Sequence, residues 1–129
     1  MNDQDRNTAG EIFGEDDLIY SYSRAQALAD GVLVDITERA RQCGIKYPTA
    51  CTAGVWALIE SIPESDRDMR DVAEAVRISA VLSAMLDAIR KARGTDRVAF
   101  RALGADLWAH CGLGDTPAPV ITVMVQGED

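Results

Sequence analysis

The sequence predicts an α+β fold in which N-terminal helices, including one long central helix, are followed by a small C-terminal antiparallel sheet. Residues 67–92 carry apolar side chains at helical spacing. Residues 98–125 instead hold three short segments with alternating or β-branched side chains. The chain has 129 residues, of which 47% are hydrophobic and 26% charged, and this composition is typical of one globular domain.

Acidic residues are concentrated at the N-terminus. Residues 1–20 hold six acids and one base, and the whole chain has a formal net charge of −8. We therefore expect residues 1–17 to form a flexible acidic arm and residues 18–129 a single α+β domain. The acidity argues against direct nucleic-acid binding, because phosphate recognition needs a cationic surface. It favours contact with a basic protein or nucleoprotein complex.

The sequence carries no sign of a membrane segment, a secretory signal or a bound cofactor. No apolar run approaches the roughly 18–20 residues that span a bilayer. The N-terminal ten residues are polar, unlike a secretory signal. The three cysteines, Cys43, Cys51 and Cys111, form no C-x-x-C pair, and the single histidine leaves too few ligands for a structural zinc. These features predict a cytoplasmic protein with reduced thiols and no metal.

Three short helices are expected before the long one, over residues 24–29, 36–42 and 53–61. Ser23 and Gln26 have the spacing of a capping box. Asp35 and Glu38 have the same spacing and predict a second box. Thr52 has the residue type and position of an N-cap for the third helix.

The long helix is predicted over residues 67–92. Its apolar stripe is wide, so we expect it to be the buried centre of the fold. The stripe includes Met69, Val72, Val76, Ile78, Val81, Leu82, Met85, Leu86 and Ile89. Asp66, Asp68 and Asp71 lie at its start, where carboxylates stabilise the helix dipole. This interpretation is favoured over a divalent-cation site.

Three short strands are predicted near the C-terminus, over residues 98–103, 107–111 and 120–125. The Gly- and Pro-rich loop 112–119 joins the last two as a hairpin. Strand alternation places either Leu107 or Trp108 on the outside. An outward Trp108 would be a contact residue, because tryptophan is enriched at interfaces.

His110, Cys111 and Asp115 are the residues that would form the site if the protein were an enzyme. A thiolate beside an imidazole is the pairing that nucleophilic catalysis requires. Adjacent strand residues point to opposite faces, however, so His110 and Cys111 should not meet. Asp115 has the residue type that turns favour. The sequence therefore predicts no catalytic residue and leaves these three as an alternative.

Two blocks of sequence resemble a family of small uncharacterised acidic proteins carried on bacterial plasmids, integrative elements and prophages. They are residues 23–37, SRAQALADGVLVDIT, and residues 110–124, with HCGLGD followed by PVITVM. Lys46-Tyr-Pro48 and Val55-Trp56 fit the same pattern, whereas Leu113 stands where a proline is usual. The resemblance covers roughly residues 20–125. It implies a mobile genetic element protein in a bacterial cytoplasm, and it transfers no catalytic or binding residue.

These observations favour a non-enzymatic interaction protein of a mobile genetic element, in its narrower form an inhibitor of anti-CRISPR or anti-restriction type. The predicted partner-binding residues are Glu11, Ile12, Phe13, Glu15, Asp16, Asp17 and Trp108. One alternative is a small enzyme acting on a nucleotide or small molecule, with His110 lining a cavity. The other is a homo-oligomeric structural module that pairs through the edge of its C-terminal sheet.

Overall fold

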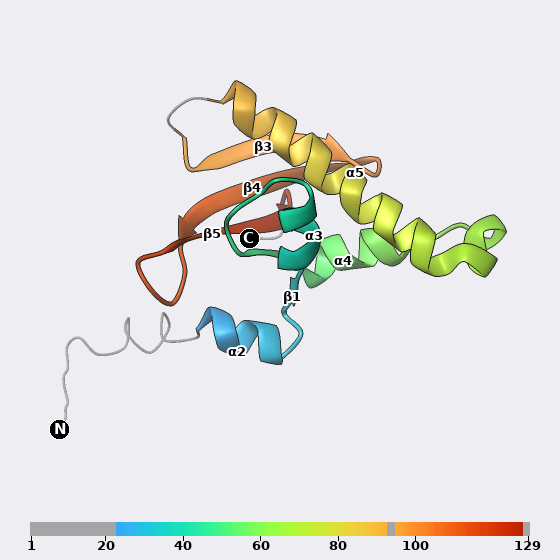
Figure 1. The fold of residues 1–129 in the computed structure, drawn as a ribbon, viewed down its shortest axis with the longest axis horizontal. Coiled ribbons are helices and arrows are strands. Elements are labelled where there is room, and N and C mark those ends of the chain that lie inside the picture. Colours follow the sequence, from blue (N-terminus) through green and yellow to red (C-terminus); the bar gives the residue numbers. More distant parts are fainter. Residues whose placement is uncertain (1–22, 93–94, 128–129) are drawn as a thin grey trace.

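The computed structural model describes residues 23–92 and 95–127. Three short helices and two short strands precede a long helix, and three strands follow it (Figure 1). In chain order the elements are α2 (Arg24–Ala29), β1 (Leu33–Asp35), α3 (Thr37–Gln42), β2 (Thr49–Thr52), α4 (Ala53–Glu60), the 3-10 helix η2 (Glu64–Met69), α5 (Arg70–Lys91), β3 (Arg97–Ala102), β4 (Ala105–Leu113) and β5 (Pro119–Val125).

The five strands form one mixed sheet in the order β1-β2-β5-β4-β3. β2 and β5 are parallel, and the other neighbours are antiparallel. The α+β class and the C-terminal hairpins are confirmed, but the purely antiparallel sheet is wrong. The short run of residues 32–34 is apolar and mostly β-branched and indicates an extended segment where β1 lies, but the prediction placed neither β1 nor β2 in the sheet. β2 is only four residues long, and its parallel partner lies about seventy residues further along the chain, so no local period reveals it.

Helices α3, α4 and α5 cover one face of the sheet, which we call the inner face. The core there joins residues of all three helices to alternate residues of β3, β4 and β5, and its members include Ala40, Val55, Ile59, Val81, Leu82, Met85, Phe100, Leu107 and Val123. The opposite, outer face is covered in part by α2. The Arg24 guanidinium donates to the hydroxyl of Thr122 at 2.7 Å and to the carbonyl of Ile121 at 2.9 Å.

The long helix contributes buried core residues only from Ile78 onward. Ile78, Val81, Leu82 and Met85 face the core, as the apolar pattern predicts. The expectation that the whole stripe is buried is wrong for the first half, where the side chains of Met69, Val72 and Val76 are exposed. The cause is visible in Figure 1: η2 and the first turns of α5 extend beyond the sheet, so no strand lies beneath them.

Two of the three predicted helix caps are confirmed. The hydroxyls of Ser23 and Thr52 accept hydrogen bonds from the backbone N–H groups three residues later, at 2.9 and 3.3 Å. The capping box at Asp35 is wrong, because Asp35 ends β1 and Ile36 occupies the N-cap position of α3. Asp35 instead accepts from the N–H of Thr37 at 3.0 Å, as in a local turn.

Across residues 23–92 and 95–127, no helix combines the length and apolar character that crossing a bilayer requires.

Candidate functional site

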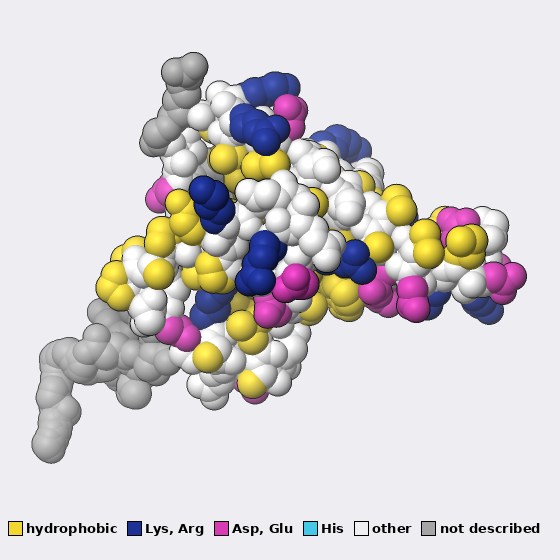
Figure 2. Space-filling view, in the orientation of Figure 1, with side chains coloured by type: hydrophobic (Ala, Val, Ile, Leu, Met, Phe, Trp, Pro, Cys, Tyr) yellow, Lys and Arg dark blue, Asp and Glu magenta, His cyan; other side chains and the backbone are white. Residues whose placement is uncertain are grey.

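The most unusual surface of the described chain is the part of α5 that projects from the body. We define the α5 tip as residues 64–79, which comprise η2 and the first half of α5. Met69, Val72 and Val76 are 61%, 53% and 61% exposed there. Figure 2 shows hydrophobic side chains gathered at this projecting end beside acidic ones. Large apolar side chains grouped at one site, rather than scattered singly, mark interaction surfaces.

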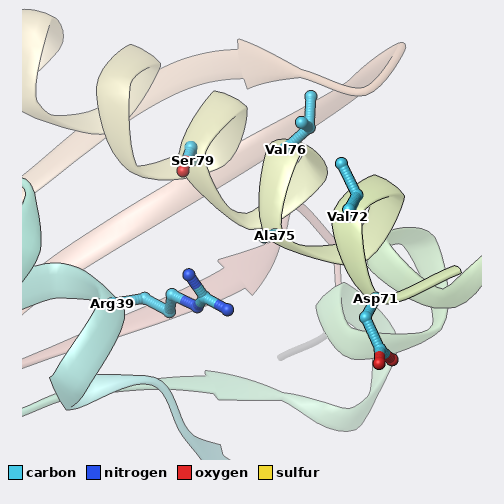
Figure 3. Close-up of a pocket in the computed structure, with 6 residues that line it drawn as sticks. All are labelled: Arg39, Asp71, Val72, Ala75, Val76 and Ser79. Atoms are coloured by element: carbon cyan, nitrogen blue, oxygen red, sulfur yellow. The ribbon is translucent and has the colours of Figure 1, made fainter. Parts of the chain in front are cut away.

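A shallow groove of about 460 Å³ runs along the α5 tip. Its lining residues are Arg39, Asp71, Val72, Ala75, Val76 and Ser79. Figure 3 shows Arg39 reaching from α3 toward α5, while Val72 and Val76 project side by side from the helix. The groove is mainly apolar, with one cation and one carboxylate at its margins. Such a surface fits apolar side chains of a partner better than it fits a substrate that needs several polar contacts.

The acidic charge of the described chain is also concentrated at the α5 tip. Over the described residues thirteen acidic side chains face eleven basic ones, so the body is close to neutral. Within residues 64–74, however, five acids stand against two arginines, and the acids are Glu64, Asp66, Asp68, Asp71 and Glu74. The net charge of −8 is therefore not spread over the domain. It is carried by the chain termini and, within the described part, by this tip.

An acidic network joins the base of the tip to α4. Arg70 forms an ion pair with Glu60, the last residue of α4. Glu60 and Glu74 also share a hydrogen bond, which lowers the pKa of Glu60 and raises that of Glu74. The opposite directions of the two pKa shifts are typical of carboxyl groups that lie close enough to interact. Among the described residues no group of three or more His, Cys, Asp or Glu side chains is placed to hold a metal ion.

The backbone of α4 is tied to α5 by Arg77. Its guanidinium donates to the carbonyls of Ile59 at 2.9 Å and Leu58 at 2.7 Å. Both carbonyls lie in the last turn of α4, where the backbone donors of the helix run out. The Leu58 carbonyl also accepts from the N–H of Ser61 at 3.3 Å, so Arg77 is a second donor there. Arg77 therefore caps α4 and fixes the direction in which the α5 tip leaves the body.

Trp108 lies on the outer face of the sheet and is half-buried, whereas its neighbour Leu107 is fully buried in the core. The Arg97 guanidinium stacks over the Trp108 ring at 4.8 Å from the centroid. Trp108 also pairs across the strands with Ala99 and Met124. Trp108 is therefore the residue of this pair that faces outward, and its role as a contact residue stays a prediction.

The structure does not bring His110, Cys111 and Asp115 together. His110 is exposed on the outer face, while Cys111 is half-buried and packs against the core. Burial raises the pKa of the Cys111 thiol, with a further contribution from Asp96, so this thiol stays protonated at neutral pH. Both carboxylate oxygens of Asp115 accept from backbone N–H groups of α2. The three groups therefore have separate surroundings, and none of them activates another.

The predicted contact residues of the arm, Glu11, Ile12, Phe13, Glu15, Asp16 and Asp17, lie outside the described residues. The α5 tip was missed as a contact surface, although the sequence holds a signal for it. Residues 78–86 contain no charged side chain, whereas Val72 and Val76 are surrounded by Arg70, Asp71 and Glu74. Charged residues among the apolar ones favour solvent exposure of this half of the stripe, although they do not show where the sheet ends beneath it.

Comparison with protein-family models, curated proteins and solved structures finds no match to this chain.

Proposed function

We propose that this protein is a non-enzymatic interaction protein that inserts the α5 tip into an apolar groove with a basic rim on a partner protein. The observation that carries the proposal is the exposure of Met69, Val72 and Val76 on a helix that projects from the body. An amphipathic helix that docks by apolar residues spaced three and four apart is a common mode of recognition.

Charge favours a basic partner. The acids of residues 64–74 border the apolar residues of the tip, so a complementary surface carries Lys or Arg around an apolar centre. The same charge disfavours a second copy as the occupant, because two tips would bring like charges together. The rim contacts control the association rate and its salt dependence, whereas the buried apolar contacts control dissociation.

The proposal has a narrower form, in which the partner belongs to a nucleic-acid-handling defence complex of a bacterium. The protein would then act in the cytoplasm as an inhibitor of anti-CRISPR or anti-restriction type, encoded by a plasmid or prophage. Its support is the resemblance in residues 23–37 and 110–124, together with the acidic tip, since such complexes present cationic grooves. An assay of nuclease activity with added protein tests this form, and an unchanged cleavage rate at saturating protein contradicts it.

A paired capture experiment tests the broader proposal. The full chain, the variant Val72→Ser/Val76→Ser and a control variant Val32→Ser/Leu113→Ser are each used as bait in a bacterial lysate. Val32, in the turn before β1, is 51% exposed, and Leu113, the last residue of β4, is 74% exposed, so the control removes exposed apolar surface away from the tip. We expect the wild type and the control to retain a basic protein that the tip variant does not retain. The amount of this protein that is retained should fall as the salt concentration rises.

A set of captured proteins that is the same for all three baits contradicts the proposal, because binding would then not depend on the tip. Circular dichroism of the three baits shows whether they are folded alike. Capture that is lost in both variants contradicts it as well, since general surface hydrophobicity would then explain the binding.

A further inference from the structure

β3 is an edge strand of the sheet, and its register with β4 determines which of its backbone groups point to the open edge. Arg97 is in register with His110, and the N–H of Cys111 donates to the carbonyl of Asp96 at 2.7 Å. Hydrogen-bonded and non-bonded pairs alternate in an antiparallel ladder. The backbone groups of Val98, Phe100 and Ala102 therefore face β4, while those of residues 97, 99 and 101 point to the edge.

The edge-facing residues carry their side chains on the outer face of the sheet. Arg97 and Arg101 stand at either end, with the small Ala99 between them. The Thr95 hydroxyl bonds the N–H and carbonyl of Arg97 at 3.3 and 2.6 Å. Beyond this local turn, the N–H and carbonyl groups of Ala99 and Arg101 point to the open edge of the sheet. An added strand would thus meet two cations four residues apart, with hydrogen-bonding groups between them. Both cations already have neighbours on the outer face, because Arg97 stacks over Trp108 and Arg101 forms an exposed ion pair with Asp106.

The N-terminal part of the chain contains a segment with the complementary pattern. Residues 11–15 read Glu-Ile-Phe-Gly-Glu, with two acids four residues apart. We propose that this segment, which lies outside the described residues, adds to β3 as a sixth, antiparallel strand. The proposed register is Glu11 opposite Arg101, Phe13 opposite Ala99 and Glu15 opposite Arg97. This inference is independent of the proposed function, which rests on the α5 tip.

The register satisfies both faces of the sheet. On the outer face the two acids meet the two arginines, and opposite charges across an antiparallel pair are stabilising. Phe13 stands opposite Ala99, whose small side chain separates it from the ring of Trp108 on β4. On the inner face Ile12 stands opposite Phe100, which belongs to the core. A one-residue slip would exchange the faces and place the acids on the inner face.

The length and direction of the chain agree with this arrangement. Arg24 is bonded to Thr122, which is in register with His110 and, through it, with Arg97. Glu15, placed opposite Arg97, would lie in the same row, about three strand spacings or roughly 14 Å from β5. The eight residues from Glu15 to Ser23 span up to about 26–29 Å when extended.

The occupant is the chain's own segment rather than a second copy of β3. Pairing of β3 with its symmetry mate about Ala99 would set Arg97 opposite Arg101 twice, and like charges directly opposite are destabilising. The arginines thus oppose the edge-to-edge association that the homo-oligomeric alternative requires. A tethered segment has the further advantage of a millimolar effective concentration.

Amide hydrogen exchange in the full-length protein, followed by NMR, tests the inference. The N–H groups of Ala99 and Arg101 point to the edge, so they are protected only if a strand pairs there. We expect exchange at least about tenfold slower than for an unstructured amide. The N–H of Phe100 bonds β4 and is the internal reference. Exchange of Ala99 and Arg101 at the unprotected rate overturns the proposal.

Two charge-matched variants identify the occupant. Glu11→Arg/Glu15→Arg reverses the proposed contacts, and Asp3→Arg/Asp5→Arg makes the same change in net charge outside them. We expect the first variant to lose the protection of the edge amides and the second to keep it. Equal protection in both, or equal loss in both, overturns the proposal. So does protection that falls on dilution, because a second copy would then be the occupant.

Discussion

Asp115 holds the first turn of α2 through both oxygens of its carboxylate. Oδ1 accepts from the N–H of Arg24 at 2.7 Å, and Oδ2 accepts from the N–H of Ala25 at 3.0 Å. The Arg24 side chain returns to β5, where it bonds Ile121 and Thr122. These hydrogen bonds therefore join α2 to the loop between β4 and β5, which lies about ninety residues further along the sequence.

Replacing Asp115 by alanine should lower the free energy of unfolding by about 1–2 kcal/mol, the usual cost of losing a helix N-cap acceptor. Asp115→Asn should cost less, because the amide oxygen still accepts one of the two bonds. Urea denaturation followed by circular dichroism measures both. Asp106→Ala is the control, since its exposed ion pair with Arg101 is worth less than about 1 kcal/mol. Equal effects at the two positions would contradict the role given to Asp115.

Arg77 offers a second test of a contact that spans two elements. Arg77→Ala leaves the carbonyls of Leu58 and Ile59 without their guanidinium donor and should cost about 1–3 kcal/mol in urea unfolding. Arg77→Lys should recover only part of this loss. The ammonium group can still donate to one carbonyl, but it lacks the planar fork that reaches both oxygens. Arg90→Ala, an exposed site on the same helix, is the matched control. A loss at Arg90 as large as that at Arg77 would show that helix charge, rather than capping of α4, is being measured.

The sequence predicted those elements whose formation depends on residues close together in the chain. The hydroxyl caps at Ser23 and Thr52 and the β-branched run of β5 depend on neighbouring residues, and both were predicted. The strand β2 depends on pairing with β5 and on burial of Thr49 and Cys51, which no local pattern contains. The mixed sheet could therefore not be predicted from periodicity alone.

The candidate site shows the same division. The alternation of side chains along a strand correctly predicted that His110 and Cys111 lie on opposite faces of the sheet. The exposure of Val72 and Val76 depends instead on where the sheet ends beneath α5, a property of the assembled fold (Figure 1). A helical stripe records which residues share a face, but it does not record how far the covering layer extends.

The carboxyl pair at the base of the tip predicts a pH dependence of stability. The pKa of Glu74 is raised, chiefly by its hydrogen bond with Glu60, so the folded protein keeps this proton after the unfolded chain has lost it. Protonated Glu74 therefore adds to the free energy of unfolding in full below the ordinary pKa of glutamate, about 4.3. This stabilisation is lost as the pH rises through the raised pKa of Glu74 in the folded protein. The lowered pKa of Glu60 acts oppositely, and its contribution is lost as the pH falls through the lowered value.

Glu74→Gln should remove the first of these two contributions and keep a hydrogen-bond donor for Glu60. We expect the variant to be more stable than wild type at pH 7, by less than about 1 kcal/mol because the pair is partly exposed. Its stability should also fall less between pH 4 and the neutral range. Thermal unfolding at several pH values measures this, and Glu38→Gln, at an exposed site on α3, is the control. A wild-type profile unchanged by Glu74→Gln would show that the two carboxyl groups do not interact in solution.

Two valines on the same helix separate the buried half of α5 from its tip. Val81 is fully buried, whereas Val76 is 61% exposed, so Val81→Ala removes two core methyl groups and should cost about 1.5–3 kcal/mol. Val76→Ala removes little buried surface and gains helix propensity, so its free energy of unfolding should stay within about 0.5 kcal/mol of wild type. Urea unfolding of both variants gives the comparison. A cost at Val76 near that at Val81 would mean that the tip is already covered in the free protein, by a second copy or by another part of the chain. Val76→Ala would then no longer isolate partner binding from folding, and the apolar stripe would serve the stability of the protein itself.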